Sequence, residues 1–349
     1  MRVFVSEYLC SGGLADQPLP PSLAAEGQAM WRAVIEDLVA IEGVTVTTTR
    51  DPRVSALEMK GVDEIVVTTP EQEHAAFRHH CSTADAILLI APELDDELSR
   101  RIAKAHYYAK PNTKFWNAPL KFCRLASDKF ATWQCLVKRG MPTVPTDLLT
   151  EWRGETKGPV VIKPRFGAGS QETFFCKSRT EIDAASDHFA ATPVERQAVV
   201  QPYVAGRSLS CLVFVNTPHQ LDISILTYCP PAEQRLSEDG RFQYLGGRMP
   251  AMKVDPERVH RLMSQALDAL SAETRSRVEG PIGFDFIESA ETGELLIVDV
   301  NPRFTTSYLG CRRLAAGNLL APMTGFESSE LSWREGPLTF TVADLAVAH

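Results

Sequence analysis

Two apolar segments near the C-terminal end of the chain carry the residues best suited to hold a metal ion. Residues 283–287 (GFDFI) and 295–303 (LLIVDVNPR) are typical of two strands joined by a short turn. Such a hairpin would set Asp285 beside Asp299, and Asn301 would project from the same face as Asp299 because it lies two residues further along. Carboxylate and amide oxygens suit Mg²⁺, and paired buried carboxylates are costly without a cation. The pattern predicts a magnesium site; the alternative is that these acids only cap strand ends.

A second segment supplies positive charge. Residues 159–170 (PVVIKPRFGAGS) are typical of a strand that ends at Lys163 and runs into a glycine-containing loop. Backbone N–H groups of such a loop can cradle a phosphate, and a lysine can neutralise it. The Gly-Lys-Ser/Thr signature of a Walker A loop is absent from the sequence. On this segment alone, a phosphate site and a plain strand with a surface hairpin fit equally well.

A third segment, residues 199–210 (VVQPYVAGRSLS), predicts a strand, a turn at Gly206 and a second strand. If the turn joins two lobes, its backbone groups can meet an adenine ring. Gln201, Tyr203 and Val204 would then line the adenine slot. An ordinary hairpin is the simpler interpretation of this segment taken alone.

The elements that must position these residues begin with an alternating pattern. The first part of the chain alternates short β-branched or apolar runs with helical patterns, at residues 2–6, 24–41, 44–49, 64–68, 71–80, 86–90 and 93–109. This alternation predicts a small parallel α/β sheet, whose ligands would sit at the carboxyl ends of its strands. Two glycines follow the first strand in residues 6–13, and they fit a ligand-facing turn and a plain turn equally well.

The rest of the chain predicts an α+β body. A helix is expected to begin at Ser127 and to stop at Gly140. From residue 160 to about residue 297 the pattern is mainly strands rich in β-branched residues, interrupted by helices at 181–189 and 256–271.

Length, charge and cysteine spacing limit the class of protein. The chain has 349 residues, more than one compact core usually holds, so two or three lobes are expected. Its net charge of −8 argues against a nucleic-acid partner, and its longest apolar run, about residues 86–91, is too short to cross a membrane. The cysteines form no Cys-x-x-Cys pair, which argues against a zinc site or a disulfide framework. No secretory signal is predicted at the N-terminus, so we expect a reduced, cytoplasmic protein.

The three segments occur in the order and at the distances found in the ATP-grasp family, which the chain resembles over about residues 120–315. The resemblance implies a mixed α/β and α+β architecture, an ATP-grasp fold preceded by a parallel α/β (pre-ATP-grasp) domain. It divides the chain into an N-terminal substrate-side domain, residues 1–120, a first ATP-grasp lobe, residues 121–198, and a second lobe with the metal site, residues 199–349.

The resemblance also implies a role for each matched residue. ATP would be held by two lysines, the loop over the phosphates and the hinge beside the adenine: Lys129, Lys163, Gly167, Gly169, Ser170, Gln201, Tyr203 and Val204. Mg²⁺, with Mn²⁺ as an alternative, would be held by Asp285, Asp299 and Asn301. The catalytic residues would be two arginines that meet the acyl phosphate or the substrate carboxylate, Arg303 and Arg248. The substrates would be contacted by Glu7, Ser11, Gly12, Thr305, Thr306 and Ser307, of which the last three fit a helix N-cap cluster equally well.

Three departures from the family pattern bear on the site. The family more often has Glu at the position of Asp299, whose shorter side chain would favour one-oxygen coordination. Pro202 follows Gln201 where the hinge often has Glu, and proline removes a backbone donor. Arg207 stands where an acidic residue often follows the hinge glycine, which leaves the ribose contact open.

Within the family, residues 5–13, 245–250 and 301–310 are similar to the tyramine–glutamate ligases of methanofuran biosynthesis and their bacterial relatives. The resemblance implies a ligase that joins a small-molecule carboxylate to an amine through an acyl phosphate, with release of ADP and phosphate. Glutamate with tyramine, tyrosine or a related amine is the implied pair, in methanofuran- or methanopterin-type cofactor biosynthesis. The alternatives are a non-ligating ATP-binding regulatory protein and a small-molecule kinase on the same fold. A homodimer is the expected assembly if the chain oligomerises.

Overall fold

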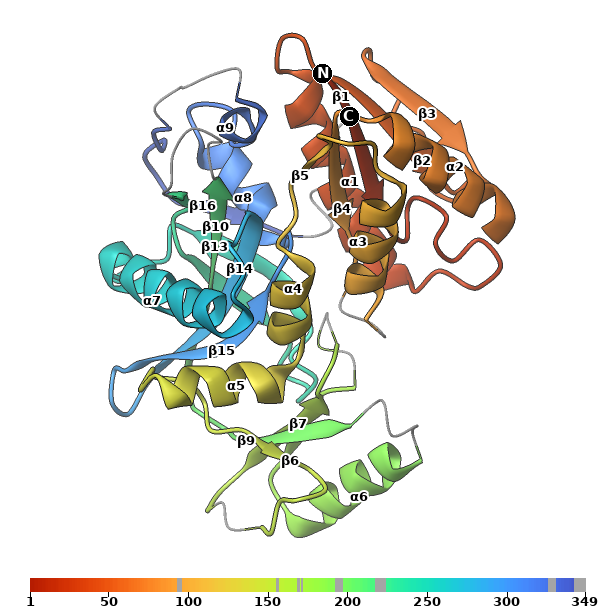
Figure 1. Ribbon diagram of the computed structural model, residues 1–349. Coiled ribbons are helices and arrows are strands. Elements are labelled where there is room, and N and C mark those ends of the chain that lie inside the picture. The colour runs from red at the N-terminus through yellow and green to blue at the C-terminus, as the bar shows by residue number, and fades with distance from the viewer. Residues whose placement is uncertain are drawn as a thin grey trace.

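The computed structural model describes residues 1–92, 96–154, 157–167, 170, 172–191, 197–216, 224–325 and 331–341. Its described strands form three sheets, which follow one another along the chain in Figure 1. The first sheet takes strands from residues 2–115, the second from 147–202 and the third from 206–340. The mixed α/β fold expected from the sequence is confirmed, whereas the domain limits at residues 120 and 198 stay a prediction. None of the described helices is long and apolar enough to span a membrane.

The N-terminal sheet is all parallel, with the strand order β3-β2-β1-β4-β5. Its strands are β1 (Arg2–Glu7), β2 (Thr45–Arg50), β3 (Val62–Val66), β4 (Ala86–Ile90) and β5 (Lys114–Phe115). The connecting helices are α1 (Pro21–Val39), α2 (Pro70–Thr83) and α3 (Glu97–Tyr108). Every residue of β4 is buried, as expected for a strand with helices on both faces. The predicted parallel sheet is confirmed.

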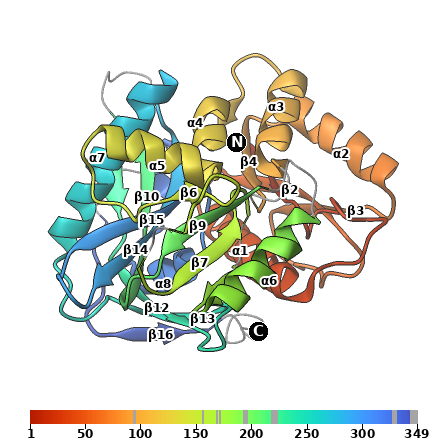
Figure 2. The ribbon, with the colours of Figure 1, turned by 90° about the horizontal axis from the view of Figure 1, so that it is seen from below.

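A four-stranded antiparallel sheet forms the small lobe, which lies in front in Figure 2. In the order β6-β9-β7-β8, its strands are β6 (Asp147–Leu148), β9 (Ala198–Pro202), β7 (Val160–Pro164) and β8 (Phe174–Cys176). Helix α6 (Arg179–Ala190) begins with a capping box between Ser178 and Glu181. Its residue Phe189 packs with Val160 and Ile162 of β7, so the helix covers one face of this sheet.

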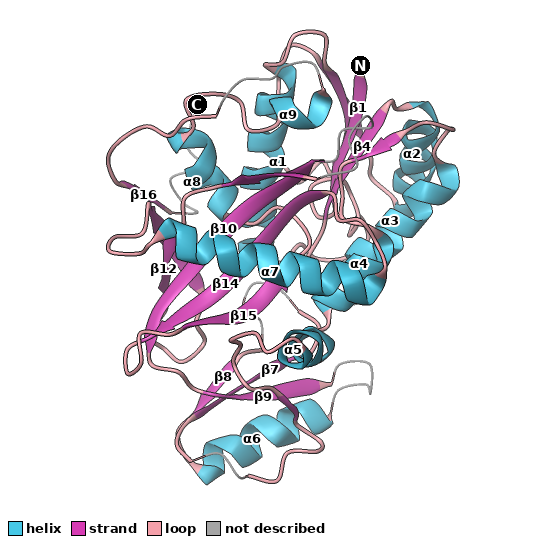
Figure 3. Cartoon of the chain, turned by 60° about the vertical axis from the view of Figure 1, so that its left-hand side comes forward, coloured by secondary structure: helices cyan, strands magenta, loops and turns pink. Residues whose placement is uncertain are grey.

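The large sheet has the order β15-β14-β10-β12-β13-β16, with β11 paired to β10. Its strands are β10 (Gly206–Asn216), β11 (Ile225–Tyr228), β12 (Ala232–Leu236), β13 (Tyr244–Met249), β14 (Gly280–Ser289), β15 (Leu295–Asn301) and β16 (Leu338–Phe340). Helices α4 (Leu120–Ser127), α5 (Lys129–Lys138) and α7 (Pro256–Thr274) pack together on one face, as Figure 3 shows. Helix α8 (Ser307–Leu314), followed by α9 (Ala321–Thr324), packs on the other face. Alternate residues of β10 serve the two faces, since Val213 joins the core with α7 and Phe214 joins the core with α8.

The N-terminal domain and the large sheet share one apolar core. Trp31 and Ile35 of α1 pack in the same buried cluster as Tyr308 and Leu309 of α8. The two helices are therefore held side by side, which brings the start of α1 close to the strands that carry the predicted metal ligands.

The helix expected from Ser127 to Gly140 is interrupted at Asp128. The backbone of Asp128 is extended (φ −94°, ψ 101°), and its carboxylate accepts hydrogen bonds from the N–H groups of Phe130 and Ala131. Asp128 is thus the N-cap of α5, and Ser127 is the last residue of α4. The predicted start at Ser127 was wrong, because Ser127 belongs to the preceding helix and the carboxylate of Asp128 accepts the first free N–H groups of α5. The break places Lys129 in the first turn of α5.

Candidate active site

A cleft of about 300 Å³ is lined by strands of both the small and the large sheet, together with Glu26 of α1. Most of the residues that the sequence predicts to bind nucleotide, metal or substrate line it: Lys129, Lys163, Gly167, Ser170, Gln201, Tyr203, Val204, Asp285, Asp299, Asn301, Arg303, Thr305, Thr306 and Ser307. Arg248, Glu7, Ser11 and Gly12 are not among its lining residues. Gly169 lies outside the described residues.

The strand pair β14–β15 brings two carboxylates together. Asp285 and Asp299 stand opposite each other in the antiparallel register, as the sequence predicts. Asn301 Nδ2 and Gln234 Nε2 donate to the two carboxylate oxygens of Asp285, each at 2.9 Å. Burial, together with the nearby charge of Asp299, raises the pKa of Asp285 to about 6. Two carboxylates held opposite each other in this way fit a hard divalent cation such as Mg²⁺ or Mn²⁺.

Two lysines bring positive charge to the same cleft. Lys129 Nζ lies 3.4 Å from Asp299 Oδ2 and donates to the carbonyl of Gly167 at 2.9 Å. Lys163 is near the end of β7, where burial lowers its pKa to about 8 although the charge of Asp299 opposes that shift. A lysine in the first turn of a helix meets the positive end of the helix dipole, and a buried ammonium group has lost its water. Both lysines would therefore be stabilised by a bound anion such as a phosphate.

An ion pair that the sequence did not single out ties the loop after β7 to the start of α5. Arg165 donates to both carboxylate oxygens of Asp128, from Nε at 2.7 Å and from Nη2 at 2.6 Å. The backbone N–H of Lys129 also donates to the carbonyl of Arg165 at 3.2 Å. Because Asp128 caps α5, this bidentate pair sets the position of Lys129 relative to the loop at Gly167.

The segment after β9 connects the small sheet with the large one. Gln201 is buried and donates to Thr146 Oγ1 at 2.9 Å, so its amide nitrogen is used within the protein. Tyr203 is 39% exposed, and its ring lies nearly parallel to that of Phe242, with 17° between the planes and 6.3 Å between the centroids. Both rings line the cleft. An aromatic wall of this kind suits a planar heterocyclic base.

Arg207 stands where the family often has an acidic residue that would contact the ribose. In the structure its side chain points away from the cleft. It donates to Glu288 of β14 from both Nε and Nη2, and to the carbonyl of Met252 at 2.7 Å. The next residue, Ser208, lines the cleft, because successive residues of a strand face opposite sides. Ser208, and not Arg207, is therefore the residue of this strand segment that lines the cleft.

Helix α1 supplies an acidic group on a different side of the cleft. Glu26 Oε2 accepts a hydrogen bond from Thr306 Oγ1 at 3.1 Å. Burial raises the pKa of Glu26, and the hydrogen bond from Thr306 and the charge of Arg303 offset this only in part. Thr306 stands at the N-cap position of α8 but makes no side-chain cap bond there, so the N-cap alternative does not account for its hydroxyl.

Two names are used below for parts of this cleft. The lysine side consists of Lys129, Lys163, Asp285, Asp299 and Asn301. The α1 side consists of Glu26, Tyr244, Arg303, Thr305 and Thr306.

Comparison with known proteins places this arrangement in a family. A model of the ATP-grasp domain matches residues 126–307, just over half of the chain, a stretch that runs from the end of α4 through the hairpin β14–β15. The chain belongs to the ATP-grasp family. A second model, the pre ATP-grasp 3 domain, matches residues 44–111 of the N-terminal sheet.

The relatives of this ATP-grasp protein are distant. The D-alanine–D-alanine ligase of Francisella philomiragia subsp. philomiragia is 24% identical over 209 residues, which are 58% of this chain and 66% of the ligase. This chain thus matches slightly less than two thirds of that ligase's length. A solved Archaeoglobus fulgidus protein assigned to the ATP-grasp superfamily is 20% identical, with a TM-score of 0.65 over 95% of this chain and 90% of that chain. The biotin carboxylase domain of Hydrogenobacter thermophilus 2-oxoglutarate carboxylase, solved with MgADP, is 15% identical, with a TM-score of 0.69 over 96% of this chain and 73% of that chain. At these identities the structural likeness shows the fold alone.

Several residues predicted to be catalytic or to contact substrates lie outside the ATP-grasp cleft. Arg248 is on β13, opposite Glu233 of β12. Glu7 and Ser11 are buried at the carboxyl end of β1, and Gly12 follows with a φ of +86°. The structure does not bring these residues to the cleft, and their roles stay predictions.

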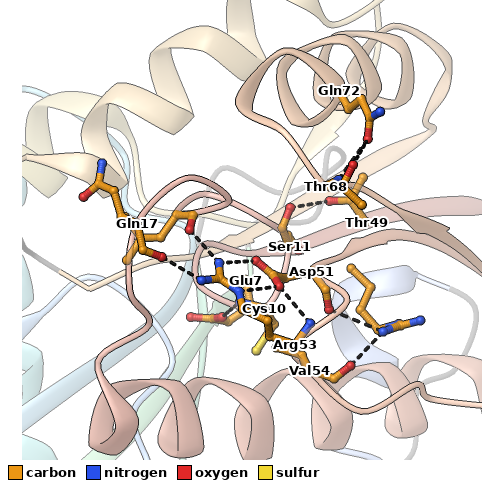
Figure 4. A network of polar contacts seen from close by, with 12 residues as sticks. Glu7, Cys10, Ser11, Gln17, Thr49, Asp51, Arg53, Val54, Thr68 and Gln72 are labelled. Carbon is orange, nitrogen blue, oxygen red and sulfur yellow. Dashed lines mark hydrogen bonds and ion pairs between the residues drawn. The ribbon is translucent and has the colours of Figure 1, made fainter.

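Polar groups at that end of the N-terminal sheet contact one another, as Figure 4 shows. Glu7 Oε2 accepts a hydrogen bond from the N–H of Cys10 at 2.7 Å. The carbonyl of Ser11 accepts one from the hydroxyl of Thr49 at 3.1 Å. Arg53 binds Asp51 at 2.6 Å and also donates to the carbonyl groups of the loop that follows β1. These contacts order the loop after β1 within the N-terminal domain.

Among the lining residues that the sequence did not single out are Glu26, Ser208 and Tyr244. Glu26 falls in a helical segment whose clear pattern is apolar, and its partner Thr306 is 280 residues further along the chain. The position of Ser208 at the cleft follows from the alternation of side chains along a strand, once Arg207 is known to face Glu288. No local pattern marks Tyr244, which becomes a lining residue only because β13 joins the large sheet.

Proposed function

We propose that this ATP-grasp protein is an ATP-dependent carboxylate–amine ligase that forms an amide bond through an acyl phosphate. The proposal is carried by one observation: the ion pair between Lys129 and Asp299, at 3.4 Å, lies in the same cleft as Lys163 and Asp285. This observation supports the proposal, because lysines that would neutralise phosphates and carboxylates that would bind a divalent cation line the same cleft. The family match over residues 126–307 supports the same class of chemistry.

The proposed reaction has two steps. An oxygen of the substrate carboxylate attacks the γ-phosphorus of ATP, the bond to ADP breaks, and an acyl phosphate forms. The amine nitrogen then attacks the acyl carbon, the carbon–oxygen bond to the phosphate breaks, and phosphate leaves as the nitrogen loses a proton. Little covalent chemistry falls to the protein, whose work is to position the groups and to stabilise their charge.

Each group on the lysine side has a place in this scheme. Lys129 and Lys163 would neutralise the phosphates of ATP, with Gly167 and Ser170 of the loop beside them. Asp285, Asp299 and Asn301 would hold Mg²⁺ or Mn²⁺. When bound, such an ion neutralises charge on the phosphate oxygens. Arg303, close enough to Asp285 to lower its pKa, would face the carboxylate as it is phosphorylated.

The adenine would lie at the hinge. Tyr203, Val204 and Phe242 line that part of the cleft. Gln201 also lines this part of the cleft, and one N–H of its amide supports the hinge by donating to Thr146. Ser208 is the candidate for a ribose contact.

For the substrates, we propose glutamate as the acid and tyramine, tyrosine or a related amine as its partner, in methanofuran- or methanopterin-type cofactor biosynthesis. The support is the similarity of residues 5–13, 245–250 and 301–310 to the ligases named above. Part of the last segment, Asn301, Arg303 and Thr305 to Ser307, lines the cleft, which is where residues that select substrates would act.

A screen for ADP formation tests the proposal. The protein would be incubated with ATP, Mg²⁺ and glutamate, with and without tyramine, tyrosine or pterin-linked amines, and the products weighed by mass spectrometry. A ligase forms an amide product and ADP only when acid and amine are both present. A phosphorylated product without amide would indicate a kinase, and ATP binding without turnover would indicate a regulatory protein. If no glutamate pair gives an amide but another acid in its place does, the glutamate assignment is rejected and the ligase function is retained.

A further inference from the structure

One carboxylate of the cleft has no place in the nucleotide chemistry. Among the described lining residues the acidic side chains are Asp285, Asp299 and Glu26. The first two face each other on the lysine side. Glu26 instead comes from α1, a helix that lies outside both family matches.

The surroundings of Glu26 leave its charge largely uncompensated. Its Oε2 accepts the hydrogen bond from Thr306 Oγ1 at 3.1 Å, and among the described residues Glu26 forms no ion pair. Burial raises the pKa of Glu26, which means that its anionic form lacks the stabilisation that water would give. A cationic group of a ligand would supply that stabilisation.

Another acid of the same helix has a different environment. Asp37 accepts hydrogen bonds from the Tyr308 hydroxyl and from two nitrogens of Arg312, with Nη2 at 2.7 Å. Glu36 accepts one from Arg312 Nη1 at 2.9 Å. These contacts join α1 to α8 outside the cleft, so the two helices are held together without any ion pair at Glu26. The carboxylate of Glu26 is therefore available for a ligand.

The neighbours of Glu26 narrow the kind of ligand. Arg303 is close enough to lower the pKa of Glu26, so a positive and a negative side chain are near each other on the α1 side. The hydroxyl of Tyr244 is buried and has no hydrogen-bond partner among the described residues, and the charges of Glu26 and Asp285 both raise its pKa. Tyr244 is thus near both Glu26 and Asp285. This arrangement matches a small molecule with an ammonium group close to a carboxylate.

We infer that Glu26 binds the ammonium group of the acid substrate, which is therefore an amino acid. The inference rests on the proposed function and adds the residue that recognises the amino group of its acid substrate. In this role Glu26 holds the ammonium in its protonated form, which has no free electron pair, so this group is distinct from the nitrogen that attacks the acyl phosphate. Glu26 thus recognises a spectator ammonium on the acid, while the substrate carboxylate points to Arg303 and the γ-phosphate.

Matched pairs of acids test the inference. Glutamate and glutarate, aspartate and succinate, and alanine and propionate differ only by an amino group. Their dissociation constants would be measured by titration calorimetry, and kcat/KM for ADP formation would be measured with a fixed amine. The wild-type protein should prefer the amino acid of at least one pair by tenfold or more. Glu26→Gln should lower that preference roughly 10- to 100-fold, as expected for the loss of a charged hydrogen bond.

Glu36→Gln is the matched control, because it makes the same change on the same helix, at a residue that contacts α8 outside the cleft. It should leave the preference unchanged, and Glu26→Asp should restore part of it. No preference in the wild-type protein, or a preference that survives Glu26→Gln, would overturn the inference. An equal fall in kcat for both acids of a pair, with the preference intact, would also overturn it, because Glu26 would then act on the amine. If no acid supports ADP formation, the proposed ligase function fails, whereas the binding titrations still decide the role of Glu26.

Discussion

The lysine side and the α1 side of the cleft differ in how their charges are balanced. On the lysine side, Asp299 is paired with Lys129 at 3.4 Å, and Asp285 accepts hydrogen bonds from two amide groups. On the α1 side, Glu26 has one hydrogen bond from a neutral hydroxyl. On the lysine side the polar groups already contact one another before a ligand binds. On the α1 side the negative charge of Glu26 is left for a cationic group of the substrate to neutralise. The difference suggests that ATP is bound by a prebuilt site and the acid substrate is selected by an incomplete one.

The two sides also differ in where they lie in the chain. The lysine side falls entirely within residues 126–307, which match the ATP-grasp domain. The α1 side joins that domain to the N-terminal helix, through Glu26 and Thr306. A change on the α1 side should therefore alter substrate choice and leave ATP binding intact, and a change on the lysine side should do the reverse.

The largest effect is expected from Asp299→Asn. The change removes a charge that pairs with Lys129 and that would bind the metal, so kcat should fall by roughly 100- to 1,000-fold, the range seen when one electrostatic contact to a transition state is lost. Because the pair lies in the cleft rather than in an apolar core, the melting temperature should stay within a few degrees. Steady-state ADP release and thermal unfolding check both points. Activity within threefold of the wild type would show that Asp299 holds no metal.

Lys163→Met should weaken ATP use by roughly 100-fold in kcat/KM, since a buried ammonium group facing phosphate is lost. Its pKa of about 8 shows that burial opposes the charge, so the free energy of unfolding should stay the same or rise. ATP affinity of the wild-type protein should also fall as the pH rises through about 8, where the lysine loses its proton. Calorimetric titration of ATP at about one pH unit below and about one pH unit above this value should show the fall in the wild type and not in the variant.

The pair Asp128–Arg165 should have an intermediate effect. Arg165→Lys keeps the charge but cannot reach both carboxylate oxygens, so Lys129 would be less well positioned and kcat should fall by about tenfold. Asp128→Asn should give a similar loss. The double variant should be no worse than either single one, because both break the same contact. Additive losses in this double-mutant cycle would indicate that the two residues act separately.

Asp37→Asn and Glu26→Gln should affect stability in opposite ways. Asp37 is bound by Arg312 and Tyr308, so its neutralisation should lower the free energy of unfolding by about 1–2 kcal/mol and leave kcat within threefold. The pKa of Glu26 is raised in the folded protein. At pH values above the usual pKa of a glutamate, its negative charge therefore lowers the free energy of unfolding. Removing that charge should therefore raise the free energy of unfolding or leave it unchanged. Urea denaturation at neutral pH measures both values, and a loss of stability in Glu26→Gln would make Glu26 a structural contact.

The smallest effect is expected when the pH is lowered and the preference for glutamate over glutarate is measured. Below the raised pKa of Glu26 its carboxylate is protonated, so the preference for glutamate over glutarate should shrink as the pH falls, before ordinary carboxylates titrate. Asp285, with a pKa of about 6, also titrates, but its protonation would affect both acids alike, and the ratio of their kcat/KM values removes it. A ratio that is independent of pH in the wild type, or that falls equally in Glu26→Gln, would contradict the assignment.

The sequence was informative where contacts are local. The hairpin that pairs Asp285 with Asp299 follows from two strands joined by a short turn, and its register is confirmed. The parallel N-terminal sheet follows from the alternation of apolar runs with helices. Asp128 was missed because a capping carboxylate is hard to recognise inside a helical pattern, although it splits the segment into α4 and α5.

The α1 side could not be predicted because its residues meet only in the folded chain. Glu26 and Thr306 are 280 residues apart, and packing of α1 against α8 through Trp31 and Tyr308 brings them together. The substrate contacts expected at the end of β1 stay predictions. In the structure the side chain of Glu7 is buried and accepts a hydrogen bond from the N–H of Cys10, which the sequence pattern did not indicate.

Oxygen transfer from the acid to phosphate tests the ligase chemistry most directly. The acid substrate would carry ¹⁸O in its carboxylate, and the phosphate released with ADP would be analysed by mass spectrometry. If the carboxylate attacks the γ-phosphorus and the amine later displaces phosphate, each released phosphate should contain one oxygen from the acid, and Asp299→Asn should slow its appearance. Unlabelled phosphate released alongside an amide product would contradict the acyl phosphate, and with it the roles proposed for Lys129, Lys163 and Arg303.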